Sequence, residues 1–130
     1  AFYIAVTDSD GGPTGASVGG AVRPGGAVLH LDATDVDADG NAGNNPADGA
    51  QVSNWDDSSG SNLDAVQQSA APVVASGAIN GKDAIDFSGA DDALHVADSS
   101  AINLAAHEER SHAIAFQTGD DVSGFQVVYE

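Results

Sequence analysis

One segment constrains this chain more than any other, because residues 35–40 read Asp-Val-Asp-Ala-Asp-Gly and so place three carboxylates on alternate residues before a glycine. Negative charges this close repel one another unless a cation lies between them. Hard oxygen ligands on a tight loop suit Ca²⁺, and the glycine permits a sharp turn around the ion. The pattern is typical of a calcium loop. A solvated acidic turn is the alternative, since Asp and Gly are ordinary turn formers.

The pattern matches a helix-flanked calcium loop only in part. Such a loop carries a bidentate Glu at its twelfth position, where this chain has Pro46. We therefore expect a non-helical loop, closed by the nearest available acid, Asp48. The predicted ligands are the side chains of Asp35, Asp37 and Asp39, the backbone carbonyl of Asn41 and the carboxylate of Asp48.

The charge of the chain limits its partners. Twenty acidic residues face three basic ones, which gives a formal net charge of −17. Nucleic acid and anionic membrane surfaces are excluded as partners, because both are bound through Lys and Arg. Self-repulsion of this size destabilises a compact state unless cations screen or bind it. Two settings supply such cations: high salt, as in seawater or brine, which shortens the screening length, and extracellular calcium at about millimolar concentration. We expect a protein that is secreted or displayed on the cell surface, that is stabilised by extracellular calcium, and that is not inserted in a membrane.

Short apolar runs separated by Gly, Asp and Ser predict strands. The clearest signals are a strand over 2–7, a strand over 28–31, a hairpin of 85–87 with 94–96, and a second hairpin of 112–117 with 125–129. Such spacing favours an all-β sandwich or barrel. Residues 8–26 are too rich in Gly and Pro for a helix. We therefore divide the chain into an N-terminal strand with a Gly-rich arm (1–27) and a domain (28–130). The first strand then belongs to a different sheet or to a neighbouring subunit.

Several segments of the domain, taken in order, point to a known family. The most telling are Trp-Asp-Asp-Ser-Ser-Gly at 55–60 and Phe-Ser-Gly-Ala-Asp-Asp at 87–92, together with Leu-His-Leu-Asp-Ala at 29–33 and Ile-Asn-Gly-Lys at 79–82. From residue 28 to residue 129 the chain resembles the N-terminal part of a bacterial laminin-G-like, concanavalin A-like domain. The resemblance implies an antiparallel β-sandwich of jelly-roll type, bound calcium, and a role in glycan binding or adhesion. It also implies further strands after Tyr129, so we expect this domain to be truncated.

Other polar clusters are candidate sites. Asp91 and Asp92, at the tip of the first hairpin, and the pair Asp56 and Asp57 are candidates for a second cation site or for holding a sugar hydroxyl. Solvated turns are the alternative for both pairs. Trp55 is the only tryptophan, and we expect a core anchor beneath the acidic loop rather than a sugar-stacking platform.

Catalysis finds little support. Glutamate occurs only at 108, 109 and 130, and no strand carries the paired acids of a glycosidase. The four histidines show no metal-ligand spacing, and His30 and His95 are expected on the surface or in cross-strand pairs. We expect a non-catalytic module that recognises a glycan or a cell-surface or matrix protein. The alternatives are a subunit of a surface layer, filament or matrix assembled by strand exchange, and an accessory domain of a polysaccharide-degrading enzyme.

Overall fold

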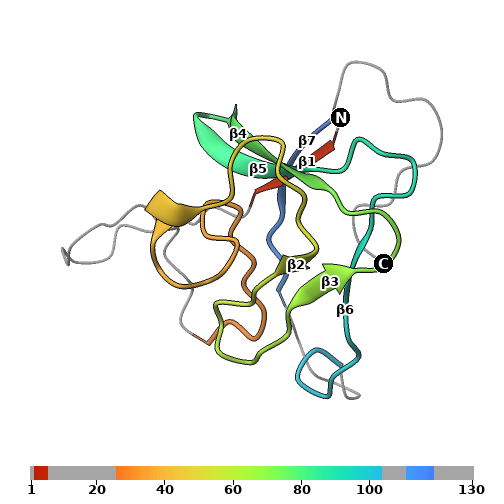
Figure 1. The fold of residues 1–130 in the computed structure, drawn as a ribbon. Coiled ribbons are helices and arrows are strands. Elements are labelled where there is room, and N and C mark those ends of the chain that lie inside the picture. The colour runs from red at the N-terminus through yellow and green to blue at the C-terminus, as the bar shows by residue number, and fades with distance from the viewer. Residues whose placement is uncertain (1, 6–25, 104–110, 119–130) are drawn as a thin grey trace.

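The computed structural model describes residues 2–5, 26–103 and 111–118, and these form short strands with a single 3₁₀ turn, η1 (Ala42–Asn44) (Figure 1). The strands are β1 (Phe2–Ala5), β2 (Asn54–Trp55), β3 (Ala65–Gln67), β4 (Val73–Ile79), β5 (Lys82–Asp86), β6 (Leu94–Val96) and β7 (Ala115–Thr118). Every pairing between them is antiparallel. The all-β prediction is confirmed. Within these ranges no helix has the length and apolar character needed to cross a bilayer.

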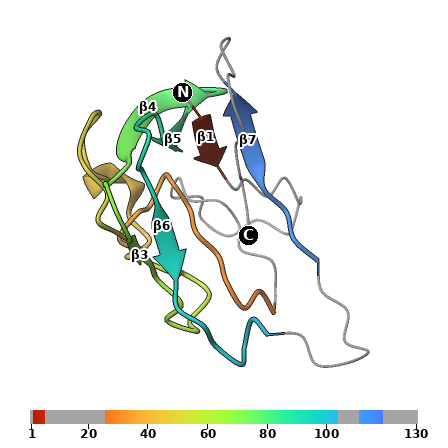
Figure 2. The ribbon, with the colours of Figure 1, turned by 90° about the vertical axis from the view of Figure 1, so that its right-hand side faces the viewer.

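The strands form two sheets. One has the order β4-β5-β1-β7 and the other β2-β3-β6; Figure 2 shows the first in the upper part of the view and β3 and β6 in the lower part. The N-terminal strand β1 lies between β5 and β7, and pairs Ile4 with Ile85 and with Phe116. The sequence had assigned this strand to a separate sheet or a neighbouring subunit, whereas the structure places it inside the larger sheet.

The predicted hairpin of 85–87 with 94–96 is wrong. Both runs contain strands, but β5 and β6 lie in different sheets. The partner of β5 is β4, joined through Asn80 and Gly81, and Ile79 pairs directly with Lys82. Both turn residues have positive φ, +51° and +75°. This is the type I′ geometry whose twist matches that of the flanking strands, and Asn-Gly is its preferred sequence. A two-residue Asn-Gly turn therefore determines which strands pair more strongly than the alternation of apolar and polar residues on either side of a longer connection.

The predicted strand over 28–31 is also absent. Its backbone bonds to a turn instead: the N–H of His30 donates to the Asp57 carboxylate at 2.9 Å, and its carbonyl accepts from the N–H of Ser58 at 3.0 Å. His30 is only 5 % exposed, so its predicted surface position is wrong. His95 is exposed and pairs with Val66 across the β3–β6 ladder, as predicted. In the second predicted hairpin β7 is a strand, and 125–129 lies outside the described residues.

The hydrophobic core draws residues from both sheets and from the acidic loop. Trp55 on β2, Val74 on β4 and Ile85 on β5 are buried together with Ala33 and Val36 of the loop. The indole N–H of Trp55 donates to the carbonyl of Asp32 at 3.0 Å. Trp55 is therefore a core anchor beneath the loop, as predicted, and its polar atom is satisfied by the segment that it supports.

The β4–β5 turn supplies a first test. Substitution Gly81→Ala forces a Cβ into a left-handed conformation and should lower the free energy of unfolding by about 1–2 kcal/mol. The matched change is Asn80→Gly. Because glycine also tolerates positive φ, this change should alter the free energy of unfolding by less than about 0.5 kcal/mol. Urea denaturation followed by Trp55 fluorescence measures both. Equal effects of the two changes would contradict the turn assignment.

Candidate metal centre

The acidic loop is attached to the core on its apolar side. Ala33 and Val36 are 1 % and 4 % exposed, whereas Asp37 and Asp39 project to solvent. Two backbone hydrogen bonds turn the chain between these residues, from Asp35 N–H to Asp32 O at 3.1 Å and from Ala38 N–H to Asp35 O at 3.2 Å. The apolar residues of the loop therefore face the core, whereas Asp37 and Asp39 face solvent.

The side chain of Asn45 fixes the loop from within. Its Oδ1 accepts from the N–H of Val36 at 3.0 Å, and its Nδ2 donates to the carbonyl of Ala33 and to Asp83 Oδ2, both at 3.0 Å. Because Asp83 belongs to β5, one amide joins the acidic loop to the larger sheet. Sequence reasoning missed this residue; the Asn-Pro pair at 45–46 was a turn signal but gave no long-range partner.

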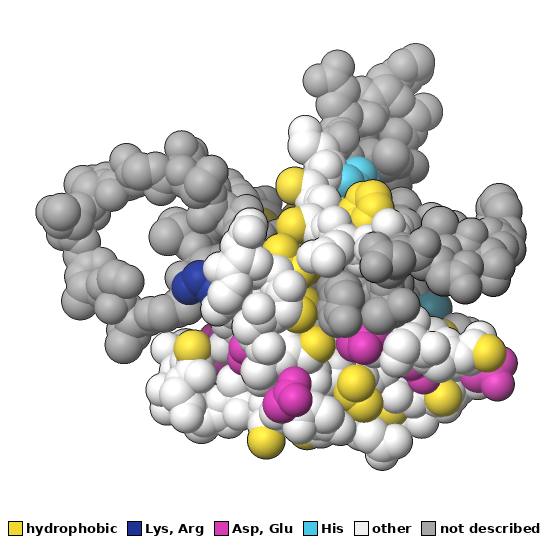
Figure 3. Space-filling model, turned by 90° about the horizontal axis from the view of Figure 1, so that it is seen from above, with side chains coloured by type: hydrophobic (Ala, Val, Ile, Leu, Met, Phe, Trp, Pro, Cys, Tyr) yellow, Lys and Arg dark blue, Asp and Glu magenta, His cyan; other side chains and the backbone are white. Residues whose placement is uncertain are grey.

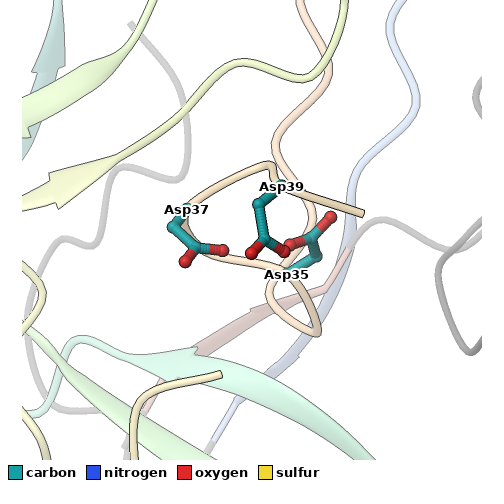
Figure 4. Close-up of side chains that lie close together, drawn as sticks. All are labelled: Asp35, Asp37 and Asp39. Carbon is teal, nitrogen blue, oxygen red and sulfur yellow. The ribbon is translucent and has the colours of Figure 1, made fainter. Parts of the chain in front are cut away.

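Asp35, Asp37 and Asp39 come together as the spacing predicts. Each offers a carboxylate oxygen within 4.8 Å of the other two, and Figure 4 shows the three side chains directed toward one another within the outline of the loop. Calcium binds oxygen at 2.3–2.6 Å, so ligands on opposite sides of one ion lie about 5 Å apart. The spacing of the three oxygens is therefore compatible with a single bound cation.

Asp35 is the buried acid of the three, and one of its oxygens lacks a donor within the described part of the chain. The residue is 8 % exposed, its Oδ2 accepts from the N–H of Gly40 at 2.9 Å, and its buried Oδ1 has no hydrogen-bond partner among the described residues. Burial raises the pKa of Asp35 against the opposing bond from Gly40, and hydrogen bonding to the Asp37 side chain and the charges of Asp37 and Asp39 raise it further. A buried acceptor without a donor is costly, and a bound cation would satisfy it.

The glycine of the motif has the role expected of it. Gly40 adopts φ +83°, which is favourable only for glycine, and so directs its N–H back to Asp35. The next residues hold Asp39: its Oδ1 accepts from the N–H of Asn41 at 2.7 Å, and its Oδ2 accepts from Asn44 Nδ2 at 2.7 Å. Asp39 therefore presents a carboxylate of fixed orientation at the rim of the site.

The remaining predicted ligands are used differently. The Asn41 side chain caps η1 by accepting from the N–H of Gly43 at 3.1 Å, and its carbonyl accepts from Asn44 at 3.2 Å. Asp48 is not in the carboxylate group; its Oδ1 accepts from the N–H of Ser76 on β4 at 2.9 Å. The structure therefore does not bring Asp48 to the three acids, and its ligand role stays a prediction.

The pair Asp56 and Asp57 divides into two roles. Asp57 is 7 % exposed and accepts four hydrogen bonds, from the backbone of His30, Ser59 and Leu63 and from the Ser59 hydroxyl. Burial alone would raise its pKa, but these bonds together outweigh burial and lower it. With both oxygens engaged, Asp57 organises the 57–63 turn. The N–H of Ser59 donates to Asp57 Oδ1 at 2.8 Å and so closes the start of this turn.

Asp56 is half-buried and faces like charges. Its N–H donates to the carbonyl of Val36 at 2.8 Å, and its carboxylate accepts from the Asn54 side-chain amide. Burial raises the pKa of Asp56 most, and the negative charges of Asp64 and Asp37 raise it further. The Asp56 carboxylate is therefore close enough to the acidic loop to interact with it electrostatically. The sequence does not show this relation, because 17 to 21 residues separate Asp56 from the three acids of the loop.

Asp91 and Asp92 lie in the turn before β6. Asp92 Oδ2 accepts from the N–H of Gly89 at 2.7 Å, and a Cβ at Gly89 would come within 2.5 Å of that carboxylate. Asp91 is exposed, and its carbonyl accepts from Ala70 at 2.9 Å. Asp92 thus closes its own turn. Among the described residues, one group of metal-ligating side chains comes together, and its members are Asp35, Asp37 and Asp39.

Acidic side chains are visible in several places on the face shown in Figure 3, whereas basic ones appear at one place.

Comparison of the chain with protein-family models, with curated proteins and with solved structures found no match. The arrangement of the site itself must therefore carry the functional argument.

The contrast between the buried acids supplies a second test. Substitution Asp57→Asn should lower the free energy of unfolding by about 3 kcal/mol at pH 7, because two donors would then face an amide N–H₂. Since the folded pKa of Asp57 is lowered, its stabilising contribution is present above the unfolded value near 3.9 and is lost as pH falls through the folded value. The stability difference should therefore shrink below about pH 4. Urea titrations of both proteins between pH 7 and pH 3 measure it; a pH-independent difference would contradict this role.

Proposed function

We propose that this chain is a non-catalytic, extracellular calcium-binding recognition module whose partner is a glycan or a cell-surface or matrix protein. The observation that carries the proposal is the group of Asp35, Asp37 and Asp39, in which a buried carboxylate oxygen of Asp35 has no hydrogen-bond partner in the part of the chain that the structure describes. The donor set is entirely oxygen, as Ca²⁺ prefers. The ion would neutralise three crowded charges and hold the loop in one conformation.

The proposal extends to the fold and the location. The two antiparallel sheets share one hydrophobic core, which supports a jelly-roll β-sandwich of the laminin-G-like kind. Extracellular calcium reaches concentrations at which weak, exposed sites are filled, and two of the three acids are exposed. The strong negative charge supports the same location, since it requires a supply of cations.

Calcium should stabilise the folded protein measurably. At a free concentration one hundred times Kd, an ion that binds only the folded state adds about 2.7 kcal/mol, which corresponds to about 10 °C in Tm for a chain of this size. Asp35→Asn should abolish most of this shift, and Asp98→Asn, which removes the same charge at an exposed position, should retain it. Circular dichroism melts in EGTA and in Ca²⁺ measure the shift, and calorimetric titration measures Kd. A Tm that ignores calcium would reject the proposal.

A second candidate is a structural subunit assembled by strand exchange. The observation that favours it is the position of β7 at the end of its sheet, where it pairs with β1 alone among the described strands; Ile114, the residue before β7, is 39 % exposed. Open sheet edges of this kind accept a strand from another chain.

Two measurements separate the candidates. A recognition module should elute as a monomer from a sizing column with and without calcium, and should retain glycans or a matrix protein on an array only when calcium is present. A structural subunit should instead form calcium-dependent polymers without such retention. Cleavage of a polysaccharide by the chain would favour the accessory-domain alternative and reject a purely binding role.

A further inference from the structure

The turn between β4 and β5 carries a chemically reactive pair of residues. Asn80 is the only asparagine of the chain that is followed by glycine, and both residues of this pair are exposed. Asparagine is a labile residue, because the backbone nitrogen of the next residue can attack its side-chain amide and close a succinimide ring. Glycine in that next position favours the attack, since it has no Cβ to obstruct the nitrogen and adopts φ of either sign.

The structure leaves the reacting atoms accessible. Within the part of the chain that the structure describes, no hydrogen bond engages the Asn80 side chain or the N–H of Gly81. A Cβ added at Gly81 would meet no atom within 4 Å. The turn therefore has room for the succinimide ring and for the water that later opens it.

One local rotation brings the two groups together. Asn80 and Gly81 have φ of +51° and +75°, which is type I′ geometry. Turning over the peptide group between them changes only ψ of Asn80 and φ of Gly81, and gives a type II′ turn in which Asn80 keeps its positive φ. The nitrogen of Gly81 then lies on the side of the Asn80 side chain. The pairing of Ile79 with Lys82 is compatible with both turn types.

The fold protects the comparable pairs elsewhere. Aspartate followed by glycine forms the same ring with loss of water, and the described residues contain two such pairs, at 39–40 and 48–49. The glycine N–H of the first pair donates to Asp35 Oδ2 at 2.9 Å, and that of the second donates to the carbonyl of Val74 at 2.8 Å. Each nitrogen must lose a hydrogen bond before it can attack, so both pairs should react slowly in the folded chain.

Asn62 provides a matched comparison within the chain. It is exposed and has φ of +53°, close to the value at Asn80. The next residue, Leu63, is 8 % exposed, and its N–H donates to Asp57 Oδ2 at 3.1 Å. A left-handed asparagine is therefore not sufficient for reaction. Asn80 differs because the nitrogen that follows it is exposed and belongs to glycine.

We infer that Asn80 is a site of spontaneous deamidation in the folded protein. The nitrogen of Gly81 gives up its proton and bonds to Cγ of Asn80, while the bond from Cγ to Nδ2 breaks and Nδ2 leaves as ammonia. Water then adds to one of the two ring carbonyls. Opening at one carbonyl gives aspartate, and opening at the other gives isoaspartate, whose backbone runs through the side chain. The inference does not depend on calcium binding.

The products act on the structure around the turn. Both add a negative charge, and isoaspartate also adds a carbon atom to the backbone of a two-residue turn whose geometry fixes the register of β4 and β5. Asp83, next to this turn, accepts from the N–H of Gly77 and from Asn45 Nδ2, both at 3.0 Å. Isoaspartate should therefore weaken the β4–β5 hairpin and, through Asn45, the attachment of the acidic loop.

The first experiment follows the reaction in the full chain. The folded protein is incubated in mildly alkaline buffer, peptide mapping by mass spectrometry measures amide loss at each asparagine, and enzymatic methylation detects isoaspartate. We expect Asn80 to react about tenfold faster than Asn62 or more, because Leu63 must first lose its hydrogen bond to a carboxylate. Asn80→Gly, which preserves the turn, should remove the signal. Retention of the Asn80 amide, or earlier loss at another asparagine, would overturn the inference.

The second experiment repeats the incubation in urea. Unfolding breaks the hydrogen bonds of the two Asp-Gly pairs, so isoaspartate should appear at Asp39 and Asp48 in urea and not in the folded chain. Asn80 should react in both states. If Asn80 reacted only in urea, the fold would protect this turn as well, and the inference would be rejected.

The third experiment measures the effect on stability. Anion exchange separates the isoaspartate form, and Asn80→Asp supplies the same charge without the additional backbone atom. Urea denaturation should show a lower midpoint for the isoaspartate form than for Asn80→Asp, which should resemble the wild type. Equal midpoints would contradict the predicted disruption of the hairpin.

Discussion

The burial of one Asp35 oxygen among like charges is the constraint on which the rest of this structure depends. Asp57 shows that a buried carboxylate can keep a lowered pKa, because four hydrogen-bond donors surround it. Asp35 is buried to the same degree, receives one donor and faces two further aspartates, and its pKa is raised. The fold surrounds the first acid with three backbone N–H groups and the Ser59 hydroxyl, whereas one oxygen of the second has no donor among the described residues.

The loop can hold such an arrangement because its other side is tightly attached. Val36 and Ala33 enter the core next to Trp55, and Asn45 bonds both of their backbones while reaching Asp83 on β5. These contacts oppose the mutual repulsion of the carboxylates, which would otherwise open the loop. A solvated acidic turn has no need of this scaffold, so the packing beneath the acids supports the interpretation of the segment as a binding site.

The sequence predicted local features well and long-range ones poorly. The proximity of the Asp35, Asp37 and Asp39 carboxylates, the turn at Gly40, the buried Trp55 and the all-β class follow from short-range chemistry, and the structure confirms them. The predicted β5–β6 hairpin was wrong, because the alternation of apolar residues indicates strands but not which strands pair. The Asn80-Gly81 turn joins β5 to β4 instead. Spacing likewise selected Asp48 as the closing acid, whereas the Asp56 backbone reaches the loop through a hydrogen bond between distant segments.

The position of the site relative to the two sheets determines how far its effects extend. The loop begins at the carbonyl that binds Trp55 of β2, is joined by Asn45 to β5, and ends where Gly49 donates to Val74 of β4 at 2.8 Å. An ion held by this loop is therefore connected to both sheets rather than to a single surface turn. Its binding free energy would oppose global unfolding, since separating the sheets requires the loop to detach. In a chain without cysteine and with a net charge of −17, a cation at this junction would perform the stabilising role that a disulfide performs in many small secreted domains.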